Sequence, residues 1–237
     1  MEFDISYLNG SLSLLHIFIC ILICLLLVNI YRESKSREYL FVGLTVLIFS
    51  SPWWPSAISI ILYIFTNEGL PDVIYFFIGN FFTPFGLISW LIAFTDMMYE
   101  DYKYPILIIY SILAIIFEIF LIFFLITDPS EIGTISGIVD VSYRSFVMIY
   151  LLIVAITLII SGILFAKETM RSTNPKIKWS GRFILIGFIS FNISAVLDGF
   201  FSTNTITLIL VRILLISSML EIYFSFNMPK FLERILI

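Results

Sequence analysis

Three charged side chains lie inside long apolar stretches of the sequence, where an ionised group is costly and usually has a partner or a function. They are Glu118, Asp198 and Arg212. In a water-poor site an arginine can bind an anionic group, and a carboxyl group without a partner can exchange a proton. His16 and Asn80 add polar side chains to two further apolar stretches. These five residues are the candidates for a ligand-binding site or an ion path.

The five candidates fall at similar depths in the segments that must position them. Counted from the outer end of each segment at the helical rise, Asp198 lies roughly 8 Å deep, Arg212 roughly 12 Å and Glu118 roughly 14 Å. His16 and Asn80 both lie near roughly 12 Å. The sequence therefore predicts one polar layer to which five helices contribute.

Two interpretations of this layer stay open. In the first, Arg212 binds an anionic group in an outward-facing pocket, and Glu118 or Asp198 balances its charge or exchanges a proton. In the second, Asp198 and Arg212 neutralise each other across the turn 202–205, which offsets much of the cost of burying them. Glu118 then stands alone as a protonated, proton-linked group. His16 is expected to be a hydrogen-bonded packing residue.

A second polar set lies near the other end of the segments. It consists of Asp96, Glu221 and Arg182. Together these residues could form an inner gate or latch. Alternatively, they extend their charged ends to the membrane interface and serve no further purpose.

The composition requires a membrane around these residues. The chain is 60% hydrophobic and 13% charged, with a mean hydropathy of +1.08, and a domain of this size cannot bury so much apolar surface in one core. Crossing a bilayer takes about 20 apolar residues. Seven stretches qualify, near residues 8–31, 39–66, 72–99, 105–127, 142–167, 182–203 and 206–226. We therefore predict an all-α, polytopic bundle of seven transmembrane helices over residues 1–226.

The basic residues indicate how the bundle is oriented. All but two of the 13 Lys and Arg residues fall in alternate connections or in the C-terminal tail. The exceptions are Arg144, in an opposite connection, and Arg212, inside the last segment. Because Lys and Arg are enriched on the cytoplasmic side, we expect an outside N-terminus, a cytoplasmic C-terminus and a multi-pass protein of the cell membrane.

Prolines and the tail add two local expectations. Pro52, Pro55 and Pro84 should kink or locally unwind the second and third segments. In the tail 227–237, apolar residues recur at helical spacing between charged ones. This pattern is typical of a short amphipathic helix that lies on the cytoplasmic membrane surface.

Several function classes lack their required residues. The stretch 206–226 contains no lysine for an opsin Schiff base, and a single histidine cannot supply a zinc site, which needs three or four ligands. No G-x-S-x-G elbow, P-loop or pair of haem-binding histidines occurs. Nucleic-acid-binding patterns are also missing. We therefore expect no enzyme activity, no cofactor, no metal and no nucleic-acid partner.

One part of the chain resembles a known family. Basic residues surround Ser172-Thr173-Asn174-Pro175 and Gly181-Arg182, and an apolar helix then ends in Leu197-Asp198-Gly199. This stretch, 167–199, resembles the connection between the fifth and sixth helices in the seven-transmembrane input domains of prokaryotic sensor kinases. It is also similar to related stand-alone archaeal seven-helix membrane proteins. The resemblance implies an extracellular-facing sensor or binding bundle of bacterial or archaeal type.

The sequence departs from those sensors after the last helix. They carry a kinase or cyclase domain there, whereas only the tail 227–237 follows here. A separate cytoplasmic signalling protein is therefore expected to receive any signal. The first hypothesis is a receptor-like protein that binds a small molecule or lipid in its outer half, with membrane lipids around its basic loops. The alternatives are a proton- or ion-coupled transporter or channel that uses Glu118, Asp198 and Arg212, and a structural scaffold.

Overall fold

Seven helical spans make up most of the protein. The computed structural model describes residues 2–200 and 204–236. Within these residues, seven spans are long and apolar enough to cross a membrane. They are Ile5–Ser34, Arg37–Thr66, Asp72–Met98, Glu100–Thr127, Phe146–Thr169, Pro175–Asp198 and Thr205–Phe226. The prediction of an all-α polytopic bundle with seven membrane-spanning segments is confirmed.

Prolines interrupt two of these spans, as predicted. The first span is the single helix α1 (Glu2–Ser34), but the second consists of α2 (Arg37–Phe49), the 3-10 turn η1 (Ser51–Trp53) and α3 (Trp54–Thr66). The third consists of α4 (Asp72–Phe81) and α5 (Thr83–Met98). Pro52 and Pro84 stand in the first turn of η1 and α5, where the missing amide hydrogen costs little.

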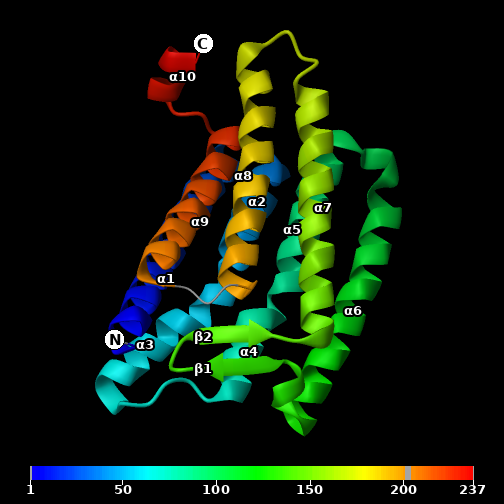
Figure 1. Ribbon diagram of the computed structural model, residues 1–237. Coiled ribbons are helices and arrows are strands. Elements are labelled where there is room, and N and C mark those ends of the chain that lie inside the picture. Colours follow the sequence, from blue (N-terminus) through cyan, green and yellow to red (C-terminus); the bar gives the residue numbers. More distant parts are fainter. Residues whose placement is uncertain (1, 201–203, 237) are drawn as a thin grey trace.

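The remaining elements run in simple order. They are η2 (Glu100–Tyr102), α6 (Lys103–Thr127), η3 (Pro129–Glu131), β1 (Gly133–Ser136), β2 (Asp140–Tyr143), α7 (Ser145–Thr169), α8 (Pro175–Phe200), α9 (Thr205–Phe226) and α10 (Lys230–Leu236). In the bundle, α8 packs between α7 and α9, α9 contacts α1, and α1 contacts α2. Helix α6 lies at the edge against α5 and α7 (Figure 1).

A β-hairpin joins α6 to α7, and the sequence analysis missed it. Strand β1 pairs antiparallel with β2, with Gly133 opposite Tyr143, and Gly137 in the turn has a positive φ of 65°. A side chain at Gly133 would put its Cβ 2.6 Å from the Ser142 carbonyl oxygen. The fifth segment was predicted to begin near 142, but that residue belongs to β2. The reason is that the strand's apolar residues merge with those of the helix that follows.

The hairpin and the tail mark opposite ends of the bundle. Figure 1 places the N-terminus beside the hairpin, and the connection between α7 and α8 at the other end with α10. Helix α8 begins at Pro175 rather than near residue 182. The turn predicted at 202–205 lies partly outside the described residues. Asn204 caps the following helix by accepting a hydrogen bond from the Thr207 amide at 2.9 Å.

Candidate functional site

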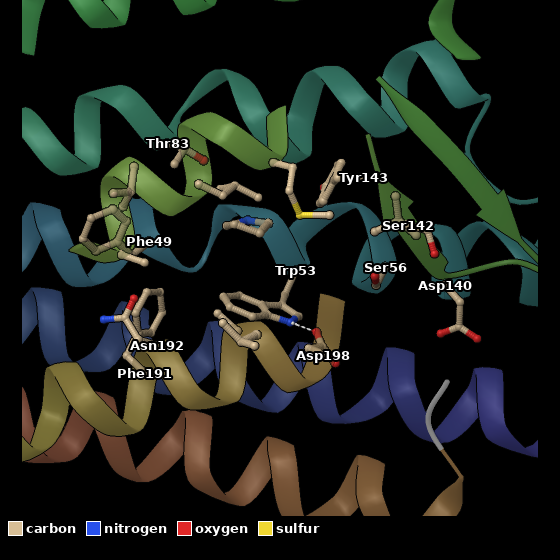
Figure 2. A pocket seen from close by; sticks show the side chains of 18 of the residues that line it. Phe49, Trp53, Ser56, Thr83, Asp140, Ser142, Tyr143, Phe191, Asn192 and Asp198 are labelled. Carbon is tan, nitrogen blue, oxygen red and sulfur yellow. Dashed lines mark hydrogen bonds between the residues drawn. The ribbon is translucent and has the colours of Figure 1, made fainter. Parts of the chain in front are cut away.

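A network of polar side chains joins five separate elements at the hairpin end. The Arg212 guanidinium forms an ion pair with Asp198, with 3.0 Å between Nη1 and Oδ2, and donates through Nη2 to Asn9 Oδ1 at 2.5 Å. Asn9 in turn donates to Asp140 Oδ1 at 2.8 Å. The Trp53 indole also donates to Asp198 Oδ2 at 2.8 Å (Figure 2). The network thus links α1, η1, β2, α8 and α9.

The local fold explains why these groups meet. The proline-induced break in the second span turns Trp53 out of a regular helix, and the guanidinium carbon of Arg212 lies 5.7 Å from the centre of its ring. The Arg212 side chain is only 2% exposed, whereas that of Asp198 is 20% exposed. Burial of the guanidinium requires the opposite charge and the hydrogen bonds that the network supplies.

A cavity of about 410 Å³ adjoins the network. Its walls come from α1, the end of α2, η1, α3, the start of α5, the hairpin, α7, α8 and α9. Figure 2 shows Phe49, Phe191 and Asn192 at one end of the cavity and Asp140 and Ser142 at the other. The volume lies in the range of small-molecule sites, which are mostly apolar with a few convergent polar groups.

Two residues of the cavity wall carry a buried polar atom that makes no hydrogen bond to any described residue. They are Thr83, through Oγ1, and Arg212, through Nε. The Tyr143 hydroxyl, which also lines the cavity, has the Asn80 side chain as a hydrogen-bond partner, while the Asn80 amide nitrogen donates to the Phe76 carbonyl at 2.9 Å. Buried polar groups are nearly always paired, so each such atom calls for an explanation. A bound molecule with acceptor or hydroxyl groups would explain both.

Asp140 is the carboxyl of the network that lies outside the spans. Burial raises its pKa above the ordinary 3.8, the hydrogen bond from Asn9 lowers it, the charge of Asp198 raises it, and that of Arg212 lowers it. The net effect is a raised pKa, because loss of water is the largest cause. Tyr75 and Tyr143 also face this region, and burial raises the pKa of the Tyr143 phenol.

The raised pKa of Asp140 predicts a pH-dependent stability. The folded state binds this proton more tightly than the unfolded state, so the contribution is fully present below the ordinary pKa and is lost as pH rises through the raised one. Thermal unfolding should therefore show the wild type losing stability relative to Asp140→Asn as the pH increases from about 4 to 8. A difference in melting temperature that stays constant over this range would contradict the conclusion that burial raises the pKa of Asp140.

His16 lies behind the network rather than in the cavity wall. It is fully buried, meets the Trp53 ring edge-to-face with 5.2 Å between centroids, and lies 3.7 Å from the Cys20 sulfur through Nε2. These contacts agree with the packing role that was expected for it. Among the candidates, the structure therefore brings Arg212 and Asp198 together and places His16 beside them.

Glu118 does not join this layer, and the predicted convergence of all five residues is wrong. It lines a separate groove of about 360 Å³ between α5 and α6, where neither carboxyl oxygen bonds to a described residue. The depth estimate ignored which helices become neighbours. The buried positions of α6 are Ala114, Phe117, Leu121 and Leu125, and Glu118 shares their face of the helix. That face packs at the edge of the bundle, because α6 contacts α4, α5 and α7.

The second predicted set also stays apart. Asp96 forms an ion pair with Lys103, and the Arg182 guanidinium carbon lies 4.5 Å from the centre of the Trp179 ring. One carboxyl oxygen of Glu221 is buried without a hydrogen bond to any described residue. A single inner latch built from Asp96, Glu221 and Arg182 is therefore not formed.

The sequence analysis missed most of the cavity's polar groups. Asn9 and Asp140 were not predicted because they lie at the edge of a span and in a connection, where polar residues are common. Thr83 and Tyr143 are individually unremarkable in sequence. The one available signal was the pair of prolines around Trp53, since a broken helix creates space between neighbours.

Comparison with known proteins leaves the geometry as the basis for assigning a function. No protein-family model, curated protein or solved structure matches this chain. The resemblance of residues 167–199 to sensor input domains therefore stays a prediction. The cavity, its unpaired polar atoms and the charged network beside it are the features that bear on function.

Proposed function

We propose that this protein is a receptor-like membrane protein that binds a small amphipathic molecule in the cavity beneath the hairpin. The observation that carries the proposal is the cavity of about 410 Å³, two of whose lining residues, Thr83 and Arg212, have a buried polar atom without a hydrogen bond to any described residue. Leaving such an atom unpaired costs about 1–3 kcal/mol. A ligand that pairs with them would recover this energy on binding.

The proposed orientation places the cavity on the outer side of the cell membrane. The basic connection between α7 and α8 and the tail helix α10 lie at one end of the bundle, and the hairpin lies at the other (Figure 1). The positive-inside rule assigns the basic end to the cytoplasm. A ligand would then be recognised from the outside or from the outer half of the bilayer.

The chemistry of the wall favours a ligand different from the anion first expected. Each terminal nitrogen of Arg212 already donates to a protein oxygen, that of Asp198 or Asn9, so a ligand could use only Nε and the second N–H of each terminal nitrogen. Two carboxyl groups, Asp198 and Asp140, line the cavity beside this one guanidinium. The electrostatic balance therefore opposes an anionic head.

Coupling to a cytoplasmic partner would run along α8 and α9. Their outer ends carry the ion pair, and at the inner end Ser180 Oγ donates to the Ser225 carbonyl at 2.5 Å. Trp179 Nε1 donates to the Leu236 carbonyl of α10 at 3.2 Å. A ligand that changes the relative position of α8 and α9 would thus move α10 as well. This tail and the adjoining basic loop are the proposed contact surface for a signalling protein and for anionic lipid headgroups.

The other two hypotheses receive less support. An ion path through Glu118, Asp198 and Arg212 needs these groups in sequence along one route, and Glu118 lines a different groove. A purely structural role explains the ion pair, but it leaves the unpaired atoms of the cavity without a purpose.

Thr83→Val tests the proposal with little change in shape. Removing a hydroxyl that has no partner should leave the free energy of unfolding unchanged or higher, because the unpaired polar group is gone. Loss of its hydrogen bond to the ligand should weaken binding about tenfold. The measurement is the amount of co-purified small molecule per protein, determined by mass spectrometry of an organic extract, together with thermal unfolding.

Thr45→Val is the matched control. Thr45 is also buried, but its hydroxyl donates to the Phe41 carbonyl at 2.7 Å and it does not line the cavity. This variant should lose a little stability and keep its ligand. Equal ligand content in the Thr83 variant and the wild type would count against the cavity as the binding site.

A further inference from the structure

The cavity reaches the lipid-facing surface between α7 and α8. Two of its lining residues, Leu152 and Val196, are also exposed large hydrophobic side chains, at 47% and 40%. A residue that both lines a cavity and is exposed marks its mouth. Leu152 lies about 10 Å along α7 from its start at Ser145, which is within the hydrocarbon layer if α7 begins at the interface.

The wall behind this mouth is largely apolar. From Leu152 it continues through Leu151 and Ala155 to the buried Val154 on α7, and on α8 from Val196 through Ala195 to Phe191, with the buried Asn192 as the polar exception. An alkyl chain entering here would contact mainly apolar side chains. The other exposed lining residues, Ser136 and Ser142, belong to the hairpin. That aqueous route leads past Asp140 and the charged network.

We infer that the ligand is a single-chain amphiphile without negative charge that enters sideways from the bilayer between α7 and α8. This inference rests on the proposed function and names its ligand class. The chain would lie along Val154 and Phe191, and the head would lie toward Asp140 and Asp198. Entry from the bilayer concentrates such a molecule near the mouth, because each buried methylene favours the apolar phase by about 0.8 kcal/mol.

Photolabelling from the lipid phase tests the route. The full-length protein is reconstituted in phosphatidylcholine vesicles that contain dodecylamine with a diazirine at the chain end, and labelled residues are mapped by mass spectrometry after illumination. Val154 and Phe191 are 5% and 8% exposed, so lipid outside the protein cannot label them efficiently. Labelling at these two residues is the expected result for a chain inside the cavity.

Two variants block the mouth and a third provides the control. Leu152→Trp and Val196→Trp should each reduce labelling at Val154 and Phe191 about tenfold. Ile149→Trp should not, because Ile149 is 61% exposed, does not line the cavity, and a side chain there leans toward the start of α7. Labelling of the lipid-facing Ile156 shows whether every sample contains the same amount of probe. Thermal unfolding shows whether each variant is folded.

The outcomes separate the inference from the proposed function. Wild-type labelling of Val154 and Phe191 that persists in both mouth variants would overturn entry between α7 and α8 while leaving the cavity as a binding site. No labelling of these residues in the wild type would overturn the amphiphile class. Equal labelling by the matched dodecanoate probe would overturn the exclusion of anionic heads. The proposed function is tested separately, by the ligand content of the purified wild type and of the Thr83→Val variant.

Discussion

Asp198→Ala is expected to lower the free energy of unfolding by about 3–5 kcal/mol, because it leaves the Arg212 guanidinium buried without an opposite charge. Arg212→Met should cost less. The carboxylate that remains in that variant is 20% exposed, against 2% for the arginine, and keeps its hydrogen bond from Trp53. The double variant should recover most of the lost free energy of unfolding, because neither charge is then buried without its partner. Unfolding of the reconstituted protein measures all three.

An exposed ion pair provides the control for this cycle. Arg171 and Glu168 lie 2.9 Å apart, but their side chains are 67% and 51% exposed, so the same cycle there should give a coupling of about 0–1 kcal/mol. Additive effects of Asp198→Ala and Arg212→Met would mean that the buried pair does not act as a unit.

Ala195→Phe is expected to abolish ligand binding, with a loss of at least about a hundredfold, while the protein stays as stable as the wild type or becomes more stable. Ala195 lies on the cavity wall, and a phenyl ring there occupies the space that the ligand needs. Filling an empty apolar space gains packing contacts rather than losing them. Ligand content and thermal unfolding should therefore change in opposite directions.

Ile193→Phe introduces the same side chain on the opposite face of α8. Ile193 is 47% exposed and does not line the cavity. Ligand content should therefore stay at the wild-type level, and the free energy of unfolding should change by no more than about 0.5 kcal/mol. If Ala195→Phe retained its ligand at the wild-type level, the binding site would have to lie elsewhere.

The membrane fold was predictable because hydropathy and proline act locally. A run of about 20 apolar residues must become a helix in lipid, where the backbone has no other partner for its hydrogen bonds. Pro52 and Pro84 lack an amide hydrogen, so they break helices wherever these fold. Both features depend on residues that are neighbours in the sequence, and both were confirmed.

The candidate site was predictable only in part because it depends on which helices pack together. Asp198 and Arg212 sit on helices that pack directly together, so their pairing follows from proximity in the chain. Glu118 has a similar predicted depth but points from α6 into another groove. Depth follows from counting residues, whereas the direction of a side chain depends on which helices become neighbours.

The hairpin was missed for a related reason. Its residues Thr134, Val141 and Tyr143 favour strands, but a hydropathy count does not distinguish a short apolar strand from the beginning of the next helix. Asp140 thereby escaped notice, although through Asn9 it completes the network around Arg212. Long-range contacts of this kind are not encoded in local patterns.

The central claim is that the cavity beneath the hairpin holds a small molecule, and native mass spectrometry of the gently solubilised protein tests it most directly. The account predicts a defined bound mass on the wild type, one per chain, that is lost in Ala195→Phe and retained in Ile193→Phe. A wild-type mass equal to that of the polypeptide alone would contradict the claim. So would a bound mass that Ala195→Phe retains.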